Sequence, residues 1–177
     1  MSEIRNLLHN PRPGMPGVAE FLADRNGTVT YLPNEVKVTT LHAGAFVLRD
    51  ITLPAGDWVW SAYVGNYTGS DECTTPRNIA MGALPADSST DVFLVPFTGV
   101  DKRYTVQFHL DTEGLVTLTL YGPNTVGESL SFSGMILASK QDYDAMRALT
   151  DANGQPLNIE WFDGDTYPRN SGGGQAT

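Results

Sequence analysis

An alternation of apolar and polar residues, strict at positions 103–110 and nearly so at 115–121, constrains the fold more than any other feature of the sequence. Every second side chain is apolar in residues 103–110, and again in residues 115–121. This period of two is typical of β-strands that bury one face, because successive side chains point to opposite sides of a sheet. Residues 111–114 have the composition of a turn, which predicts a hairpin between the two strands. The inward side chains are expected to be Tyr104, Val106, Phe108, Leu110, Val116, Leu118 and Leu120.

The remainder of the chain repeats this pattern of short apolar runs between turns. The 18 glycines and 11 prolines help to divide it at intervals of about 8 to 12 residues, a spacing typical of sandwiches and barrels. Trp58 and Trp60 lie on the same side of the run at residues 58–64, together with Ala62 and Val64, and we expect that side to face the core. Further strands are expected at residues 28–31, 36–41, 45–53, 79–84, 90–97 and 130–138, with a brief one at Leu157 and Ile159.

The periodicity changes after position 138, where helical spacing replaces the period of two. Ser139 followed by Asp142 resembles a capping box, and Tyr143, Met146 and Leu149 recur on one helical face. Taken together, the elements predict an all-β fold. We expect an antiparallel β-sandwich of the jelly-roll type with one short C-terminal helix.

The chain length and the position of the breakers predict one domain with two flanking segments. A chain of 177 residues suits a single core. Residues 1–17 contain too many prolines and glycines for a helix or a central strand, which predicts an extended N-terminal arm. Residues 18–169 then form the sandwich domain. Residues 170–177 form a glycine-rich C-terminal tail with the composition of a flexible linker.

Charge and composition argue against several classes of partner. The net charge is −9 and the 11 basic residues are scattered, whereas nucleic-acid binding needs clustered Lys and Arg. No apolar run approaches the ~18 residues of a membrane span, and the N-terminus lacks the apolar core of a signal peptide. We therefore expect a protein that is made in the cytoplasm and does not insert into membranes. The single cysteine, Cys73, excludes an intrachain disulfide and a multi-cysteine metal site.

The common catalytic and cofactor motifs are missing from the sequence. There is no nucleophile elbow, no H-E-x-x-H segment, no P-loop and no set of Rossmann glycines. His9, His42 and His109 are far apart and stand in different predicted environments. A catalytic triad of one of these histidines with a dispersed Ser and Asp is less favoured than the absence of a triad, because any chain of this size contains these residue types. We expect neither enzymatic activity nor a cofactor.

The closing residues 161–168 join two large aromatic side chains to an acidic turn. We expect Trp161 and Phe162 to plug the end of the core. Asp163 and Asp165 resemble a fragment of a calcium-binding loop, but the residues that follow supply no further carboxylate. A turn that closes the domain is therefore the simpler interpretation of this acidic pair.

The outward side of the paired strands is the candidate binding surface. Sugar-binding faces combine a flat aromatic ring with planar polar groups, and Tyr63, Tyr121, Gln107 and His109 would supply both. An ordinary solvated sheet face or a subunit contact would use the same residues. The loop at residues 65–78 is a further candidate for recognition because of its length. The candidate binding residues are Tyr63, Tyr67, Arg103, Gln107, His109 and Tyr121, with Ser61, Thr117 and Thr119 on the same predicted face.

Several segments, taken in order, resemble the jelly-roll modules of minor tail and other virion proteins of tailed phages, especially phages of actinobacteria. In that family an Asn-Pro opening arm, a strand like residues 58–64 and a terminal aromatic-Asp-Gly-Asp-Thr stretch recur in the same order. The resemblance covers nearly the whole chain. Its segments are NLLHNPRP (Asn6–Pro13), LPAGDWVWSAYV (Leu53–Val64), YTVQFHL (Tyr104–Leu110), LVTLTLYG (Leu115–Gly122), LSFSGMILA (Leu130–Ala138), DYDAM (Asp142–Met146) and WFDGDT (Trp161–Thr166).

The resemblance implies a non-enzymatic virion component, made in the bacterial cytoplasm and assembled with other virion proteins and with copies of itself in a symmetric oligomer. It also implies a fold like that of carbohydrate-binding modules, with host cell-wall glycans as a further class of partner. The chain lacks the long attachment region of larger family members, so a minor tail protein and a capsid decoration protein both stay open. A stand-alone carbohydrate-binding module stays open as well, and an enzyme acting on cell-wall sugar is the least favoured function. The N-terminal arm and the C-terminal tail are the expected attachment segments.

Overall fold

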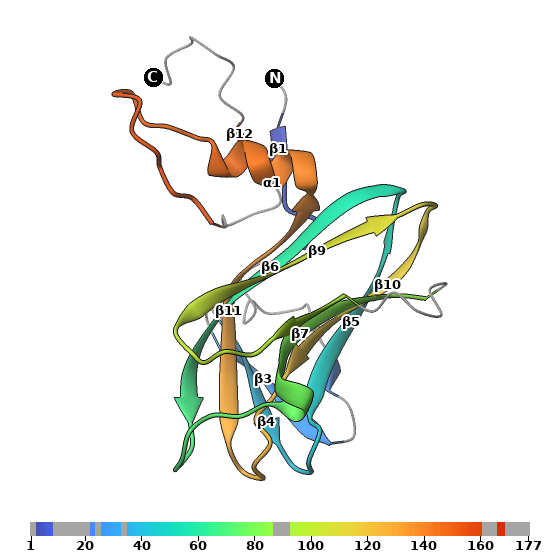
Figure 1. Ribbon diagram of the computed structural model, residues 1–177, viewed down its shortest axis with the longest axis vertical. Helices are drawn as coiled ribbons and strands as arrows, with labels where there is room; N and C mark the ends of the chain where they lie inside the picture. The colour runs from blue at the N-terminus through green and yellow to red at the C-terminus, as the bar shows by residue number, and fades with distance from the viewer. Residues whose placement is uncertain are drawn as a thin grey trace.

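The chain folds into a β-sandwich of two five-stranded antiparallel sheets with one short helix, as predicted (Figure 1). The computed structural model describes residues 3–8, 22–23, 26–32, 35–86, 93–160 and 166–168. The β6 sheet has the strand order β3 (Gly27–Leu32), β4 (Glu35–Thr40), β11 (Ser129–Ser139), β6 (Gly56–Thr68) and β9 (Lys102–Leu110). The β10 sheet has the order β2 (Leu22–Ala23), β5 (Phe46–Leu53), β10 (Gly114–Tyr121), β7 (Ile79–Pro85) and β8 (Phe93–Pro96).

The pairing of the strands identifies the topology as a jelly roll. β4 pairs with β11, β5 with β10, β6 with β9, and β7 with β8, so the pairs are nested along the chain. Successive pairs alternate between the two sheets: β4–β11 and β6–β9 lie in the β6 sheet, and β5–β10 and β7–β8 lie in the β10 sheet. This arrangement is that of one long two-stranded ribbon rolled up on itself, which is the architecture of a jelly roll. The strands predicted at residues 28–31, 36–41, 45–53, 58–64, 79–84, 90–97 and 130–138 overlap β3, β4, β5, β6, β7, β8 and β11.

The hairpin predicted between residues 103–110 and 115–121 is wrong, although both strands are present. β9 pairs with β6, whereas β10 pairs with β5 and β7. Residues 111–113 therefore connect one sheet to the other instead of turning back within a sheet. The predicted inward side chains are all buried, because both strands face the same core from opposite sides. The alternation of apolar and polar residues indicates which face of a strand is buried, but it does not indicate which strand lies beside it.

The main core lies between the sheets and contains the tryptophan side of β6, as expected. Trp60, Ala62 and Val64 are fully buried there, and Trp58 is 8% exposed. Val59 and Ser61, on the opposite side of the same strand, are also fully buried. The outer side of the β6 sheet is therefore covered near this end.

A second, smaller core provides that cover. Ile136 and Ala138 of β11 pack with Ile4, Met146 and Leu149 on the outer side of the β6 sheet. The helix α1 (Lys140–Arg147) begins as predicted, with the Ser139 hydroxyl accepting a 3.1 Å hydrogen bond from the Asp142 backbone N–H. The strands β1 (Glu3–Arg5) and β12 (Thr166–Pro168) pair with each other, and with α1 they lie at one end of the sandwich (Figure 1).

Residues 3–8 of the predicted N-terminal arm are extended and belong to the packed structure. Ile4 and Leu8 are fully buried, one in each core. The brief strand expected at Leu157 and Ile159 is not formed, since that stretch has no ladder partner. The Leu157 N–H donates to the Leu149 carbonyl, and Ile159 packs against the second core. The rest of the arm, the C-terminal tail and residues 161–165 lie outside the described residues. Within the part of the chain that the structure describes, no helix is long and apolar enough to span a membrane.

Candidate ligand-binding site

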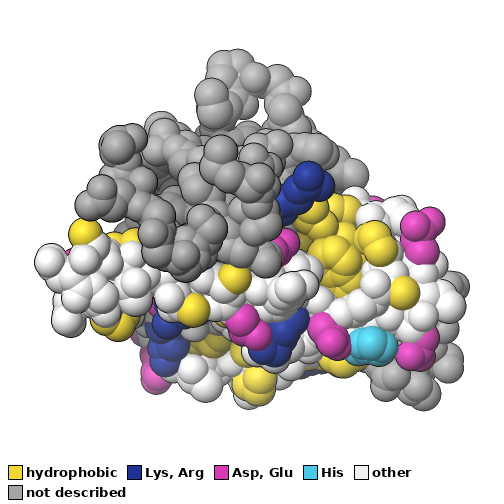
Figure 2. Space-filling view, turned by 90° about the horizontal axis from the view of Figure 1, so that it is seen from above, with side chains coloured by type: hydrophobic (Ala, Val, Ile, Leu, Met, Phe, Trp, Pro, Cys, Tyr) yellow, Lys and Arg dark blue, Asp and Glu magenta, His cyan; other side chains and the backbone are white. Residues whose placement is uncertain are grey.

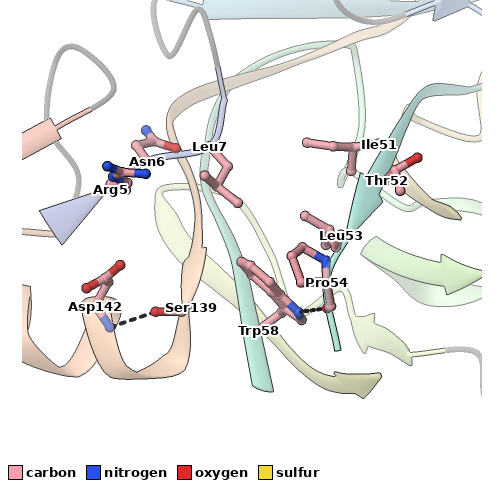
Figure 3. A pocket seen from close by; sticks show the side chains of 10 residues that line it. All are labelled: Arg5, Asn6, Leu7, Ile51, Thr52, Leu53, Pro54, Trp58, Ser139 and Asp142. Carbon is pink, nitrogen blue, oxygen red and sulfur yellow. Dashed lines mark hydrogen bonds between the residues drawn. The ribbon is translucent and has the colours of Figure 1, made fainter. Parts of the chain in front are cut away.

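A pocket of about 710 Å³ opens where β1, the end of β5, the start of β6 and the start of α1 meet (Figure 3). We call it the Trp58 pocket. Its size falls within the range of small-molecule binding sites, which is roughly 300–1,000 Å³. The residues that line it are Arg5, Asn6, Leu7, Ile51, Thr52, Leu53, Pro54, Trp58, Ser139 and Asp142.

One side of the Trp58 pocket is apolar and rigid. The Trp58 indole N–H donates a 3.0 Å hydrogen bond to the Pro54 carbonyl, which fixes the ring against the chain that enters β6. Leu53 is buried and Ile51 half-buried, and both face the pocket from β5 (Figure 3). The ring, the proline and these side chains together form an apolar wall.

The opposite side of the Trp58 pocket carries charges of both signs. Figure 3 shows Arg5 and Asp142 across the pocket from Ile51 and Pro54. The Arg5 side chain is exposed and Asp142 is half-buried. Figure 2, which looks onto this end of the molecule, shows hydrophobic side chains gathered beside basic and acidic ones. The pocket therefore combines an apolar wall with a polar rim.

The N-terminal wall of this pocket is held by the buried side-chain amide of Asn6 and by a 2.7 Å backbone hydrogen bond from the Leu7 N–H to the Leu137 carbonyl. The Asn6 side chain donates a 3.1 Å hydrogen bond to the Met135 carbonyl and accepts a 3.0 Å bond from the Leu137 backbone N–H. The register of β11 against β6 shifts at this point, where Gly134 has a φ of 51°. A bulge of this kind takes backbone groups out of the ladder. Asn6 replaces the lost partners and thereby places Arg5 and Leu7 at the pocket.

Of the predicted binding residues, Arg103 lies in a largely buried network instead of on an open surface. Its side chain is 11% exposed and forms a 3.0 Å ion pair with Glu160. The same guanidinium donates to the Ser61 hydroxyl at 3.1 Å and to the Gly134 carbonyl at 2.8 Å. Burial lowers the pKa of Arg103, and the hydrogen bond to Glu160 acts in the opposite direction. Arg103 thus joins the β11 bulge to the segment that precedes residue 161.

Tyr63, Gln107 and His109 share the outer side of β6 and β9 with Arg103, as predicted. Tyr63 stands opposite Arg103 in the ladder and is half-buried, whereas Gln107 and His109 are exposed. The His109 ring lies between two carboxylates, with Nδ1 2.7 Å from Asp57 and Nε2 3.4 Å from Asp111. The hydrogen bond to Asp57 is the main cause of a raised His109 pKa.

Tyr121 and Tyr67 lie elsewhere in the molecule. Tyr121 is on the outer side of the β10 sheet, where its ring is 5.7 Å from that of Phe46. Thr117 and Thr119 share that face, so the single predicted surface is divided between two sheets, and Thr119 is only 2% exposed. Tyr67 lies near the far end of β6, which extends to position 68 and leaves a shorter loop than the one predicted at residues 65–78.

No metal centre is formed by the described residues. Among them, no three His, Cys, Asp or Glu side chains are grouped as a metal ion would require. The carboxylates that flank His109 contact different ring nitrogens, so the three groups do not converge on one point. The acidic pair Asp163 and Asp165, considered as a calcium-loop fragment, lies outside the described residues.

Comparison with known proteins supports the fold and does not identify a family. No protein-family model matches the chain, and no curated protein matches it significantly. Solved structures do match. The CBM22-1 xylan-binding domain of Xyn10C from Paenibacillus barcinonensis has a TM-score of 0.50 and 10% sequence identity, with 78% of this chain and 94% of that domain covered.

Two further structures align less closely. TmCBM61 in complex with beta-1,4-galactotriose has a TM-score of 0.49 and 13% identity, covering 77% of this chain and 99% of that one. Tailspike protein 4 of bacteriophage CBA120, in its enzymatically active domain, has a TM-score of 0.45 and 13% identity, covering 77% of this chain but 21% of that one. At such identities the likeness shows the fold alone. The chain is a jelly-roll β-sandwich, a fold that it shares with the CBM22-1 xylan-binding domain.

Proposed function

We propose that this chain is a non-catalytic glycan-binding protein and that the Trp58 pocket receives the sugar. The observation that carries the proposal is the composition of that pocket, an indole ring and aliphatic groups facing charged and hydroxyl groups. A sugar ring offers C–H groups to the first side and hydroxyls to the second. The fold shared with a xylan-binding domain supports the same class of ligand.

The polar residues of the rim have complementary roles in this proposal. Arg5 donates hydrogen bonds to sugar oxygens, and the Asp142 carboxylate accepts them from sugar hydroxyls. Because the rim has one cationic and one anionic group, it favours a neutral sugar over a strongly charged one. Trp58 and Pro54 supply the apolar contact.

A glycan array followed by calorimetric titration of the best ligand tests this function. Arg5→Gln and Asp142→Asn should each weaken binding at least about tenfold, since a hydrogen bond to a charged group contributes roughly 1.5–3 kcal/mol and each 1.4 kcal/mol is about tenfold. Asp144→Asn is the matched control, because Asp144 lies on the same helix but pairs with Lys140 at the surface. Tyr63→Ala and Tyr121→Ala should leave the affinity unchanged. Binding lost in Tyr121→Ala and kept in Asp142→Asn would overturn this site.

We propose further that the protein is a structural component of a tailed-phage virion, namely a minor tail protein, with a capsid decoration protein as the alternative. The order of segments that resembles such virion proteins supports this location. Assembly with other virion proteins and with copies of itself belongs to the same proposal. Cryo-electron microscopy of the particle tests it, because a high copy number indicates the head and a low one the tail. Absence of the chain from the particle would contradict both.

A further inference from the structure

A second pocket, of about 550 Å³, lies near the other end of β6. It is lined by Tyr67 of β6, by residues 71–74, by Asn78 and by residues 97–100, and we call it the loop pocket. Tyr67 follows Trp58 by nine positions in one strand, which separates the two pockets by roughly 30 Å at ~3.3 Å per residue. The loop pocket is therefore a separate site.

Two aromatic rings in fixed positions form part of its wall. The Phe97 ring stacks on the Tyr104 ring, with 6.1 Å between the ring centres. The backbone N–H of Phe97 donates a 2.6 Å hydrogen bond to the Asn78 carbonyl. The Tyr67 hydroxyl lies beside the Glu128 carboxylate and closely over Gly69, where a Cβ atom would overlap it. The Phe97 ring is thus held by contacts away from the pocket, and the Tyr67 ring packs closely against Gly69.

The charge around the loop pocket is predominantly acidic. Asp71 and Glu72 line it with exposed carboxylates, and the largely buried Glu128 stands behind Tyr67. Burial is the main cause of a raised pKa of the Tyr67 phenol, and the Glu128 carboxylate is the next. The nearby Lys102 ammonium is already bound, donating to the Thr98 carbonyl at 2.8 Å and its hydroxyl at 3.1 Å.

We propose that the loop pocket binds an amino sugar through its protonated amino group. Carboxylates and aromatic faces both attract an ammonium ion, and together they select it against a neutral group of equal size. The C–H groups of the sugar ring then contact Phe97 and Val100. The choice of a saccharide rests on the proposed function, whereas the choice of a cation rests on the charge of this pocket alone.

Cys73 supplies a reporter for this pocket, because it is the only cysteine of the chain and lies in the wall. Its thiol is partly accessible, and burial, with a smaller contribution from Glu128, raises its pKa to about 11. Maleimide labelling, followed by mass spectrometry, should be slow in the native protein and fast in urea. A ligand in the loop pocket should slow it further.

The test compares the rate of Cys73 labelling with glucosamine disaccharide and with its N-acetylated counterpart. We expect severalfold protection by the glucosamine disaccharide, loss of that protection in high salt, and no protection by the N-acetylated sugar. The double variant Asp71→Asn with Glu72→Gln should abolish the protection. Asp111→Asn, an exposed carboxylate elsewhere, should preserve it, and so should Asp142→Asn at the Trp58 pocket.

Equal protection by both disaccharides would overturn the role of the ammonium group. Equal protection by butylamine would overturn the saccharide. If the amino sugar gives no protection while the Trp58 pocket binds glycan in calorimetry, the inference fails and the proposed function stands. If the amino sugar protects Cys73 and no glycan binds the Trp58 pocket, the proposed function fails at its own site and the amine site stands.

Discussion

The two ends of β6 carry pockets of similar size that are built in different ways. The walls of the Trp58 pocket come from β1, β5, β6 and α1, and its N-terminal wall depends on hydrogen bonds from Asn6 to the β11 bulge. The walls of the loop pocket come from loops that directly join core strands, with positive φ at Arg77, Asn78 and Asp101. One pocket therefore depends on the docking of a terminal segment, whereas the other is part of the jelly roll itself.

Removing the Asn6 amide should give the largest difference between the two ends. Asn6→Ala leaves the Met135 carbonyl and the Leu137 N–H buried without side-chain partners, which should lower the free energy of unfolding by about 3 kcal/mol. Urea denaturation measures this loss. Glycan affinity at the Trp58 pocket should fall strongly, while the native labelling rate of Cys73 should change little.

The conservative variant at the same position separates the donor role of the Asn6 amide from its acceptor role. Asn6→Asp keeps an acceptor for the Leu137 N–H but turns a carboxylate oxygen toward the Met135 carbonyl at a buried site, so at neutral pH it should be no more stable than Asn6→Ala. If both variants matched the wild type in stability and in glycan affinity, the N-terminal strand would not be what forms the Trp58 pocket.

Removing the Arg103 guanidinium should have the second largest effect. Arg103→Leu deletes bonds to Glu160, Ser61 and the Gly134 carbonyl, and should cost about 2 kcal/mol of unfolding free energy. Arg103→Lys should recover little of it, because an ammonium cannot reproduce the planar fork that reaches three partners. Thermal and urea unfolding of the wild type, Arg103→Leu and Arg103→Lys measure the order of their stabilities. A stable lysine variant would show that charge, and not geometry, matters here.

The strands and their buried faces could be predicted from the sequence because both depend on local periodicity. Tyr104, Val106 and Phe108 face the core as their spacing indicates. The partner of each strand could not be predicted in this way, since residues 111–113 can close a hairpin or cross to the other sheet. Only the global nesting of the ribbon decides between those outcomes.

The second core explains why the binding surface was harder to predict than the strands and their buried faces. Arg103 and Ser61 stand on the polar side of their strands, which favours exposure until α1 and β1 cover that side. One signal was present: the run Met135–Ala138 is apolar at successive positions, which is typical of a strand buried on both faces. The Trp58 pocket brings Arg5 and Asp142 together only in the folded chain, and no local sequence pattern connects them.

A substitution at Gly69 should alter the loop pocket and leave the Trp58 pocket unchanged. Gly69→Ala places a Cβ where the Tyr67 hydroxyl lies, so the ring must move at a cost of about 1 kcal/mol. Protection of Cys73 by the amino sugar should weaken severalfold, with glycan affinity at the Trp58 pocket unchanged. Ser70→Ala is the control, because that side chain is exposed and adjacent. Equal effects in both variants would point to the loop backbone and not to Tyr67.

The smallest expected effect is a pH dependence confined to the Trp58 end. The His109 pKa is raised in the folded state, chiefly by its hydrogen bond to Asp57 at the start of β6. A raised pKa means that the stabilisation is fully present below the unfolded value of about 6.5 and is lost as the pH rises through the folded value. The melting temperature of the wild type should therefore fall slightly over this window relative to that of His109→Gln. The ring is exposed, so salt should reduce the difference.

An NMR titration of His109 with an unshifted midpoint would contradict the role of Asp57. The labelling rate of Cys73, corrected for thiol ionisation, should not follow the titration of His109.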